Sequence, residues 1–302
     1  MLLIWIVFVA PNNFAAYEVM IGATLLLAVG ILDDKGLLHH QLKLFVAMPL
    51  AAFLVLWSGR RMQVFSQLFG EDAGWIADTT LSFVWVVGVT AAFSILDHMD
   101  GLCAGVCAIG SAYLFIWATS AGQAAEAVLA AGLMGAALGF LWWNFHPAKI
   151  FMGDGGAMFL GFLLAALSLR VEFAGMPAKS AWMTPTLILI VPVFDTTLVT
   201  ISRSRRGLVP FTSPGKDHTA HRIAGRRGGQ RGAVLTLYAL GAVGGALSLV
   251  LPNLDGPQRW VLASATASAV LLAIVFLERL PFEKQEPARI PKRAHSAESQ
   301  PS

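Results

Sequence analysis

The chain has 302 residues, of which 56% are hydrophobic and only 13% are charged, and its mean hydropathy is +0.67. A soluble domain averages about 25% charged residues, so this composition excludes an ordinary soluble protein and indicates a polytopic α-helical membrane protein. The net charge of +3 is too small and too unevenly placed to indicate nucleic-acid binding.

Successive apolar runs predict an all-α bundle of about ten transmembrane helices. The runs cover residues 1–13, 17–32, 40–57, 79–96, 102–121, 124–143, 156–172, 182–201, 232–251 and 260–279. We therefore expect one membrane-embedded domain over residues 1–281. Residues 282–302 are polar and contain proline, which predicts a disordered cytoplasmic tail.

Basic residues predict the orientation of the bundle. Eight Lys or Arg residues lie between positions 203 and 231, so the positive-inside rule places that stretch in the cytoplasm. Alternation of the runs then puts three other polar stretches, residues 33–39, 97–101 and 144–155, on the same side. Polar clusters that meet at one face are typical of an active site rather than of a pore.

The first polar cluster is a pair of adjacent carboxylates, Asp33 and Asp34, at the end of an apolar run. Adjacent acids repel and the helix macrodipole disfavours them at a C-terminus, so the pair suits a divalent cation better than a solvated helix end. Lys43 begins the next run and either meets a phosphate or extends to the membrane surface. Asp97 and Asp100 either hold a metal, contact a ribose or base, or are ordinary loop residues.

A further acidic residue, Asp154, lies between two glycines at the start of another apolar run. Glycines allow backbone amides to approach a ligand, and a helix N-terminus binds anions. The alternative is an aspartate that caps the helix and binds no ligand. Asn144 lies shortly before it.

The most basic loop contains His218, His221 and Arg222. Two histidines three residues apart are a weak zinc signal, so phosphate binding is the better interpretation, with a purely topological basic loop as the alternative. Carboxylates for Mg²⁺ and cations for phosphates, at one membrane surface, together predict phosphoryl transfer between a soluble donor and a lipid acceptor.

The motifs, in this order, resemble the polyprenyl-phosphate N-acetylhexosamine-1-phosphate transferase family over nearly the whole chain. The matching stretches are residues 30–34, 93–102, 144–154, 194–196 and 215–222. The resemblance implies transfer of N-acetylglucosamine-1-phosphate, or of a related sugar phosphate, from a UDP-sugar to undecaprenyl phosphate with release of UMP. This reaction would start an envelope glycan such as O-antigen at the cytoplasmic face of the bacterial inner membrane.

The resemblance also implies residue roles. The residues implied to be catalytic and to hold Mg²⁺, or Mn²⁺ in its place, are Asp33, Asp34 and Asp154. Those implied to bind substrate are Lys43 at the lipid phosphate, Asp97, Asp100 and Asn144 at the nucleotide, and His218, His221 and Arg222 at the donor diphosphate. The implied partners are the UDP-sugar, undecaprenyl phosphate, membrane lipids and a second copy of the chain, with no nucleic acid.

The chain departs from the family pattern at a few positions. The family usually begins with one more helix and a cytoplasmic loop, both of which are missing before Met1 here. It usually has asparagines at Ala91 and Ser94, and a small or amide residue at His98. The His-x-x-His-Arg form of the basic loop is closer to the N-acetylglucosamine branch than to the branch that transfers phospho-MurNAc-pentapeptide.

Three alternatives remain at the level of sequence. They are a phospho-MurNAc-pentapeptide transferase, an inactive relative that binds lipid phosphate, and a membrane transporter. A transporter needs charged residues in mid-helix along a path through the bilayer, whereas the middles of these runs are apolar apart from Glu126 and Asp195.

Overall fold

The computed structural model describes residues 17–37, 42–208, 215, 217–225 and 228–280. Over these residues every regular element is a helix, and there is no strand. In chain order the elements are α2 (Tyr17–Asp34), η3 (Lys43–Ala47), α4 (Met48–Trp57), α5 (Ser66–Phe69), α6 (Glu71–Leu96), α7 (Leu102–Ser120), α8 (Ala124–Asn144), α9 (Gly153–Arg170), α10 (Ala178–Ala181), α11 (Met183–Ile188), α12 (Ile190–Arg205), α13 (Thr219–Ala224), α14 (Gly229–Val250), η4 (Leu251–Asn253) and α15 (Gly256–Glu278).

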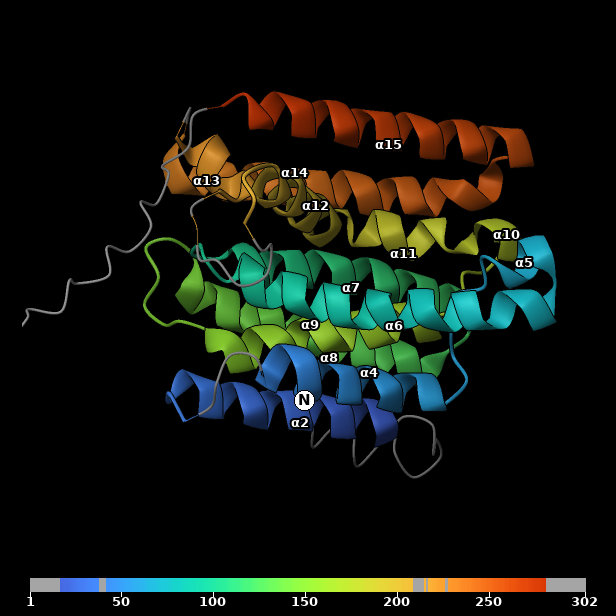
Figure 1. Ribbon diagram of the computed structural model, residues 1–302, viewed down its shortest axis with the longest axis horizontal. Coiled ribbons are helices and arrows are strands. Elements are labelled where there is room, and N and C mark those ends of the chain that lie inside the picture. Colours follow the sequence, from blue (N-terminus) through green and yellow to red (C-terminus); the bar gives the residue numbers. More distant parts are fainter. Residues whose placement is uncertain (1–16, 38–41, 209–214, 216, 226–227, 281–302) are drawn as a thin grey trace, which may run out of the picture.

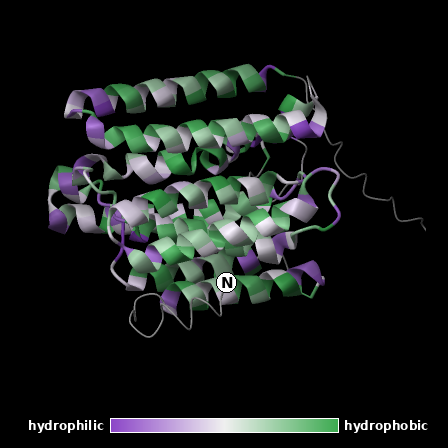
Figure 2. Ribbon diagram, turned by 180° about the vertical axis from the view of Figure 1, so that it is seen from behind, coloured by the Kyte–Doolittle hydropathy of each residue, from purple (hydrophilic) through white to green (hydrophobic). Residues whose placement is uncertain are grey.

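The long helices lie side by side, with the short α5 and α10 at one end of the bundle and α13 at the other (Figure 1). Within the described residues, five helices are long and apolar enough to cross a membrane: α6, α7, α8, α14 with η4, and α15. A bent pair, α10–α11 with α12, makes a sixth candidate. Hydrophobic residues follow the helix lengths and hydrophilic residues gather at the two ends (Figure 2). This is the arrangement of a multi-pass membrane protein.

Nine of the ten predicted apolar runs coincide with helices in the part of the chain that the structure describes. The first run and the predicted tail lie outside it, and the total of about ten spans stays a prediction. Helix α6 begins at Glu71, eight residues before the predicted start at 79. Within this extension, Asp78 accepts hydrogen bonds from the backbone amides of Val64, Phe65 and Ser66 at 2.7–3.0 Å, which ties the first turns of α6 to the segment before it.

Helix α9 forms the centre of the bundle and packs against α2 and α6. Gly30 of α2 lies directly against Gly155 of α9, and a Cβ on Gly30 would come within 2.2 Å of the Gly155 Cα atom. Gly161 also lies against α6, where a Cβ would come within 2.5 Å of the Phe93 Cβ atom and 3.2 Å of the Thr90 Cα atom. These glycines allow backbone to approach backbone, and the first of them brings the C-terminus of α2, with its two aspartates, to the N-terminus of α9.

The chain bends by 79° between α11 and α12, at Leu189. Pro192 explains the break, because it has no N–H to donate to the carbonyl of Ile188 one turn earlier. After the bend, α12 carries Asp195 and Arg203 toward α13.

Candidate active site

Lys43 joins two helices at the polar end of the bundle. Its ammonium donates a hydrogen bond to Asp33 Oδ2 of α2 at 2.8 Å and another to Asp154 Oδ2 of α9. The Lys43 side chain is only 16% exposed, so the pairs are largely shielded from solvent. Lys43 thus pairs with Asp33 at the end of α2, and its implied contact with the lipid phosphate stays a prediction.

Asp34 binds the N-terminus of α9. Its Oδ1 accepts a hydrogen bond from the Asp154 amide at 3.1 Å, and its Oδ2 lies 3.5 Å from the Gly155 amide. Gly153 permits this close approach, since its φ is +70° and a side chain there would meet the Asp34 carboxylate. The helix-terminal amides that the sequence predicted as an anion site therefore hold an anion supplied by the protein itself.

Ser94 near the end of α6 and Asp97, which follows α6, lie beside these residues. We call the whole group the acidic cluster; it consists of Asp33, Asp34, Lys43, Ser94, Asp97 and Asp154. Ser94 donates a hydrogen bond to Asp154 Oδ1 at 2.6 Å. Burial, together with the nearby Asp154 and Asp34 carboxylates, raises the pKa of Asp97 to about 7. The sequence showed Ser94 only as a departure from the family pattern, although its spacing of three residues from Asp97 places both on one face of α6.

The acidic cluster suits a hard divalent cation by its ligand chemistry. Lys43 pairs with two of the four carboxylates, and burial, together with the nearby Asp154 and Asp34 carboxylates, raises the pKa of Asp97. Oxygen ligands of this kind favour Mg²⁺ or Mn²⁺ over zinc. In the conformation described, Lys43 supplies the positive charge, and no three His, Cys, Asp or Glu side chains of the described residues are grouped so that they could hold a metal ion. Metal binding at this cluster stays a prediction.

Asp100 and Asn144 hold two loops together. Asp100 Oδ2 lies 2.8 Å from His146 Nδ1, while Asn144 accepts a hydrogen bond from the Gly101 amide at 2.9 Å and donates one to the Ile150 carbonyl at 2.8 Å. These bonds fix the turn after α6 against the loop before α9. Contact of Asp100 and Asn144 with a nucleotide stays a prediction.

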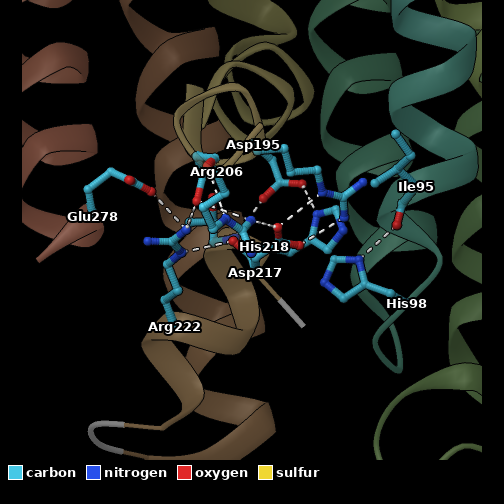
Figure 3. A network of polar contacts seen from close by, with 11 residues as sticks. Ile95, His98, Asp195, Arg206, Asp217, His218, Arg222 and Glu278 are labelled. Carbon is cyan, nitrogen blue, oxygen red and sulfur yellow. Dashed lines mark hydrogen bonds and ion pairs between the residues drawn. The ribbon is translucent and has the colours of Figure 1, made fainter. Parts of the chain in front are cut away.

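A second cluster, the histidine cluster, consists of His98, His218 and His221 with Asp195. His218 Nδ1 lies 2.9 Å from Asp195 Oδ2 (Figure 3). The His98 ring centre lies 4.4 Å from that of His218 and 4.8 Å from that of His221. Burial and the neighbouring His218 lower the pKa of His98 to about 4, so this ring is neutral near pH 7. The sequence signal for Asp195 was a lone acid within an apolar run.

Arg222 lies inside the protein, with a side-chain exposure of 0%. Its guanidinium donates to the carbonyls of Asp217 and Leu277 at 2.8 Å and to Ser202 Oγ at 2.7 Å, and it forms an ion pair with Glu278 at 2.8 Å (Figure 3). It therefore ties α13 to the last turn of α15. Its implied contact with a donor diphosphate stays a prediction, and the conformation described does not expose it for that role.

Asp217 forms ion pairs with two more cations of the basic loop. Arg203 binds it through two hydrogen bonds of 2.8 and 3.0 Å, and Arg206 also binds it. Burial would raise the pKa of Asp217, but the two guanidinium groups outweigh it and hold the pKa well below its usual range. These two arginines therefore stabilise the loop itself.

One turn connects the two clusters. Asp97 is close to Asp154 and Asp34, whereas the next residue, His98, stacks on His218. The prediction that the polar stretches around Asp33, Asp97, Asp154 and His218 meet at one end of the bundle is confirmed.

The sequence model of glycosyl transferase family 4 matches residues 17–172, which run from α2 to just beyond α9 and contain the acidic cluster. The chain belongs to this family. The histidine cluster of this glycosyl transferase draws Asp195, His218 and His221 from α12 and α13, beyond the matched residues.

Relatives of this glycosyl transferase carry related names. A probable undecaprenyl-phosphate N-acetylglucosaminyl 1-phosphate transferase of Bacillus subtilis is 36% identical over 238 residues, which cover 78% of this chain and 65% of the relative. A decaprenyl-phosphate N-acetylglucosaminephosphotransferase of Mycolicibacterium smegmatis is 31% identical over 298 residues, covering 89% of this chain and 72% of the relative. A phospho-N-acetylmuramoyl-pentapeptide-transferase of Geobacillus thermodenitrificans is 37% identical over 124 residues, or 40% of this chain and 38% of the relative. The chain thus spans about two thirds of the length of the Bacillus relative.

Proposed function

We propose that this glycosyl transferase moves N-acetylglucosamine-1-phosphate from UDP-N-acetylglucosamine to undecaprenyl phosphate, giving undecaprenyl-diphospho-N-acetylglucosamine and UMP. The observation that carries the proposal is the acidic cluster, in which carboxylates of α2, α6 and α9 surround Lys43 at the polar end of an apolar bundle. The names of the Bacillus and Mycolicibacterium relatives supply the substrate class. We place the site at the cytoplasmic face of the bacterial inner membrane.

In the proposed reaction a phosphate oxygen of the lipid attacks the phosphorus that carries the sugar, and the bond from that phosphorus to UMP breaks. Both reactants are anions, so the site must neutralise charge to bring them together. Lys43 would pair with the lipid phosphate from its position between Asp33 and Asp154. Asp33, Asp34 and Asp154 would hold Mg²⁺, which when bound neutralises charge on the transferred phosphate.

An apolar cavity suits the lipid acceptor. It has a volume of about 220 Å³, lies between α6 and α12, and is lined almost entirely by apolar side chains. Its lining includes Ala92, two residues before Ser94, and Thr196, which follows Asp195. An isoprenoid tail in this cavity would therefore end beside both clusters, where its phosphate is needed.

A second donor is supported by the Geobacillus relative, whose name specifies phospho-N-acetylmuramoyl-pentapeptide. Its match covers less than half of this chain, whereas the N-acetylglucosamine relatives match most of it. Comparison of the two UDP-linked donors in one assay separates these proposals.

The test is UMP release by purified protein with undecaprenyl phosphate, Mg²⁺ and a panel of UDP-sugars that includes UDP-N-acetylglucosamine and UDP-MurNAc-pentapeptide. We expect release with UDP-N-acetylglucosamine, loss of release with EDTA, and recovery with Mg²⁺ or Mn²⁺. Release that depends on the pentapeptide donor would support the second donor instead. No release with any donor would contradict the proposed activity.

A further inference from the structure

Asp195 is a buried acid in the middle of α12. Its side chain is almost completely buried, and both carboxylate oxygens are bound: Oδ2 to His218 Nδ1 at 2.9 Å and Oδ1 to the Thr219 amide at 2.7 Å. An acid within an apolar helix is costly to insert into a membrane, and such residues usually serve a function. The bonds of Asp195 indicate that this function concerns the histidine cluster.

The Asp195 carboxylate determines where His218 carries its proton. An ionised carboxylate only accepts hydrogen bonds, so His218 Nδ1 must be the donor and Nε2 is the nitrogen left for another partner. Within the described residues, no hydrogen bond involves His218 Nε2. The His98 ring packs against His218 at 4.4 Å and fixes the plane of its ring, so His218 is held both at its edge and on its face (Figure 3).

Asp195 is also the group that balances a positive charge on His218. The titratable groups around His218 are Asp195 of α12, His98 of the turn after α6, His221 of α13 and the adjacent Asp217. His98 is neutral near pH 7, and the Asp217 carboxylate is bound by two arginines. Asp195 therefore provides the carboxylate that stabilises a protonated His218.

We infer that Asp195 is a positioning residue: it fixes the ring proton of His218 on Nδ1 and favours protonation of Nε2 when the diphosphate of the sugar donor approaches. This inference rests on the proposed function. A protonated Nε2 donates a charge-assisted hydrogen bond to a phosphate oxygen, and such bonds are about twice as strong as neutral ones. The carboxylate–imidazole pair orients the ring, as it does for histidines in other sites.

A structural role for Asp195 predicts different behaviour. Its bond to the Thr219 amide stabilises the start of α13, so removal of the side chain would also disturb the fold. Asp195→Asn separates the two roles. The amide oxygen still accepts from Thr219, and the amide nitrogen can donate to His218 Nδ1, which moves the ring proton to Nε2 and removes the negative charge.

The kinetic test measures UMP release with UDP-N-acetylglucosamine from pH 5.5 to 8.5. We expect Asp195→Asn to lower kcat/KM by about 10- to 100-fold near pH 8, mainly through a higher KM for the donor. The loss should differ between pH 6 and pH 8, because the substitution removes the negative charge that faces the His218 ring. Equal kcat/KM values at all pH values, or a loss that does not change with pH, would overturn the inference.

Asp78→Asn is the matched control, since Asp78 is also a carboxylate buried in a long apolar helix. Asp78 binds backbone amides and Ser66 at the other end of the bundle and contacts no histidine of the described residues. We expect this variant to unfold at a lower temperature than the wild type, with no change in the shape of the pH profile. If Asp78→Asn shifted the pH profile as Asp195→Asn does, the effect would reflect loss of a buried carboxylate in general.

A second measurement does not depend on catalysis. ¹⁵N NMR of histidine-labelled wild-type protein, with the His218 signal assigned through His218→Gln, reports which ring nitrogen carries the proton. We expect Nδ1–H in the neutral ring of the wild type and Nε2–H in Asp195→Asn. Nε2–H in the wild type would overturn the inference even if the variant did not fold. If the wild type released no UMP with any donor, the proposed function would fail, while the NMR result would still decide the pairing of Asp195 with His218.

Discussion

The acidic cluster and the histidine cluster lie at the same end of the bundle, but their charges are balanced differently. In the acidic cluster, Lys43 pairs with Asp33 and Asp154, while Asp34 binds backbone amides of α9 and Asp97 lies close to the other carboxylates. Around the histidine cluster, by contrast, the buried charges have partners within the chain: Arg203 and Arg206 bind Asp217, Arg222 binds Glu278, and Asp195 binds His218. An unbalanced cluster attracts a ligand of opposite charge, whereas a balanced one maintains the shape of the protein around it.

The two clusters also differ in what positions them. Backbone contact between Gly30 and Gly155 positions the acidic cluster, and side-chain ion pairs position the α13 segment beside the histidine cluster. A larger side chain at one of these glycines should therefore disrupt the acidic cluster, whereas loss of a charged side chain should disrupt the α13 segment. The following predictions test this distinction, from the largest expected effect to the smallest.

Asp154→Asn should abolish turnover, with a loss of at least about 100-fold, because Asp154 connects Lys43 and Ser94 at the centre of the acidic cluster. The variant should remain folded, since the substitution is isosteric. UMP release and thermal unfolding check this. The control is Asp72→Asn, an exposed acid in the first turn of α6. Wild-type turnover in Asp154→Asn would contradict the proposed catalytic role of Asp154.

Arg222→Ala should lower the free energy of unfolding by about 3 kcal/mol, because it leaves Glu278 and several buried acceptors without their partner. Chemical or thermal unfolding in detergent measures this. Arg205→Ala, an exposed arginine of the same loop region, should have no comparable effect. A raised KM for the donor at unchanged stability would show instead that Arg222 acts on the diphosphate, as the family resemblance implies.

Gly30→Ala should destabilise the protein by about 1–3 kcal/mol, since the added methyl group would overlap the backbone of Gly155. Turnover should fall with it, because α2 must shift and carry Asp34 away from the α9 amides. Gly139→Ala is the control, as its Cβ would meet no atom within 4 Å. Similar unfolding curves for the two variants would argue against close backbone packing as the determinant of this cluster.

Ser94→Ala should have the smallest effect, a loss of roughly fivefold in kcat/KM, which corresponds to about 1 kcal/mol for a half-buried hydrogen bond to a carboxylate. Ser94→Asn should retain activity, because the amide also donates to Asp154. Steady-state kinetics of the two variants compare them directly. Equal losses in both would indicate that the size of residue 94 matters, rather than its hydrogen bond.

The sequence predicted the helices and the meeting of the acidic residues well, because apolar runs and paired acids at their ends are local signals. It did not predict the bend at Leu189, where Pro192 acts within an otherwise apolar run. Nor did it distinguish Arg222 from Arg205, since both lie in the same basic stretch. Only tertiary packing places one of them against Leu277 and Glu278 and leaves the other exposed.

The turn after α6 has a consequence for how substrates bind. Asp97 and His98 are neighbours in the chain, yet one faces the acidic cluster and the other stacks on His218. A displacement of this turn therefore moves Asp97 relative to the acidic cluster and, at the same time, moves His98 relative to His218. Occupancy of the acidic cluster and affinity for the donor should therefore be linked, and thermodynamic reciprocity requires each to change the other by the same factor.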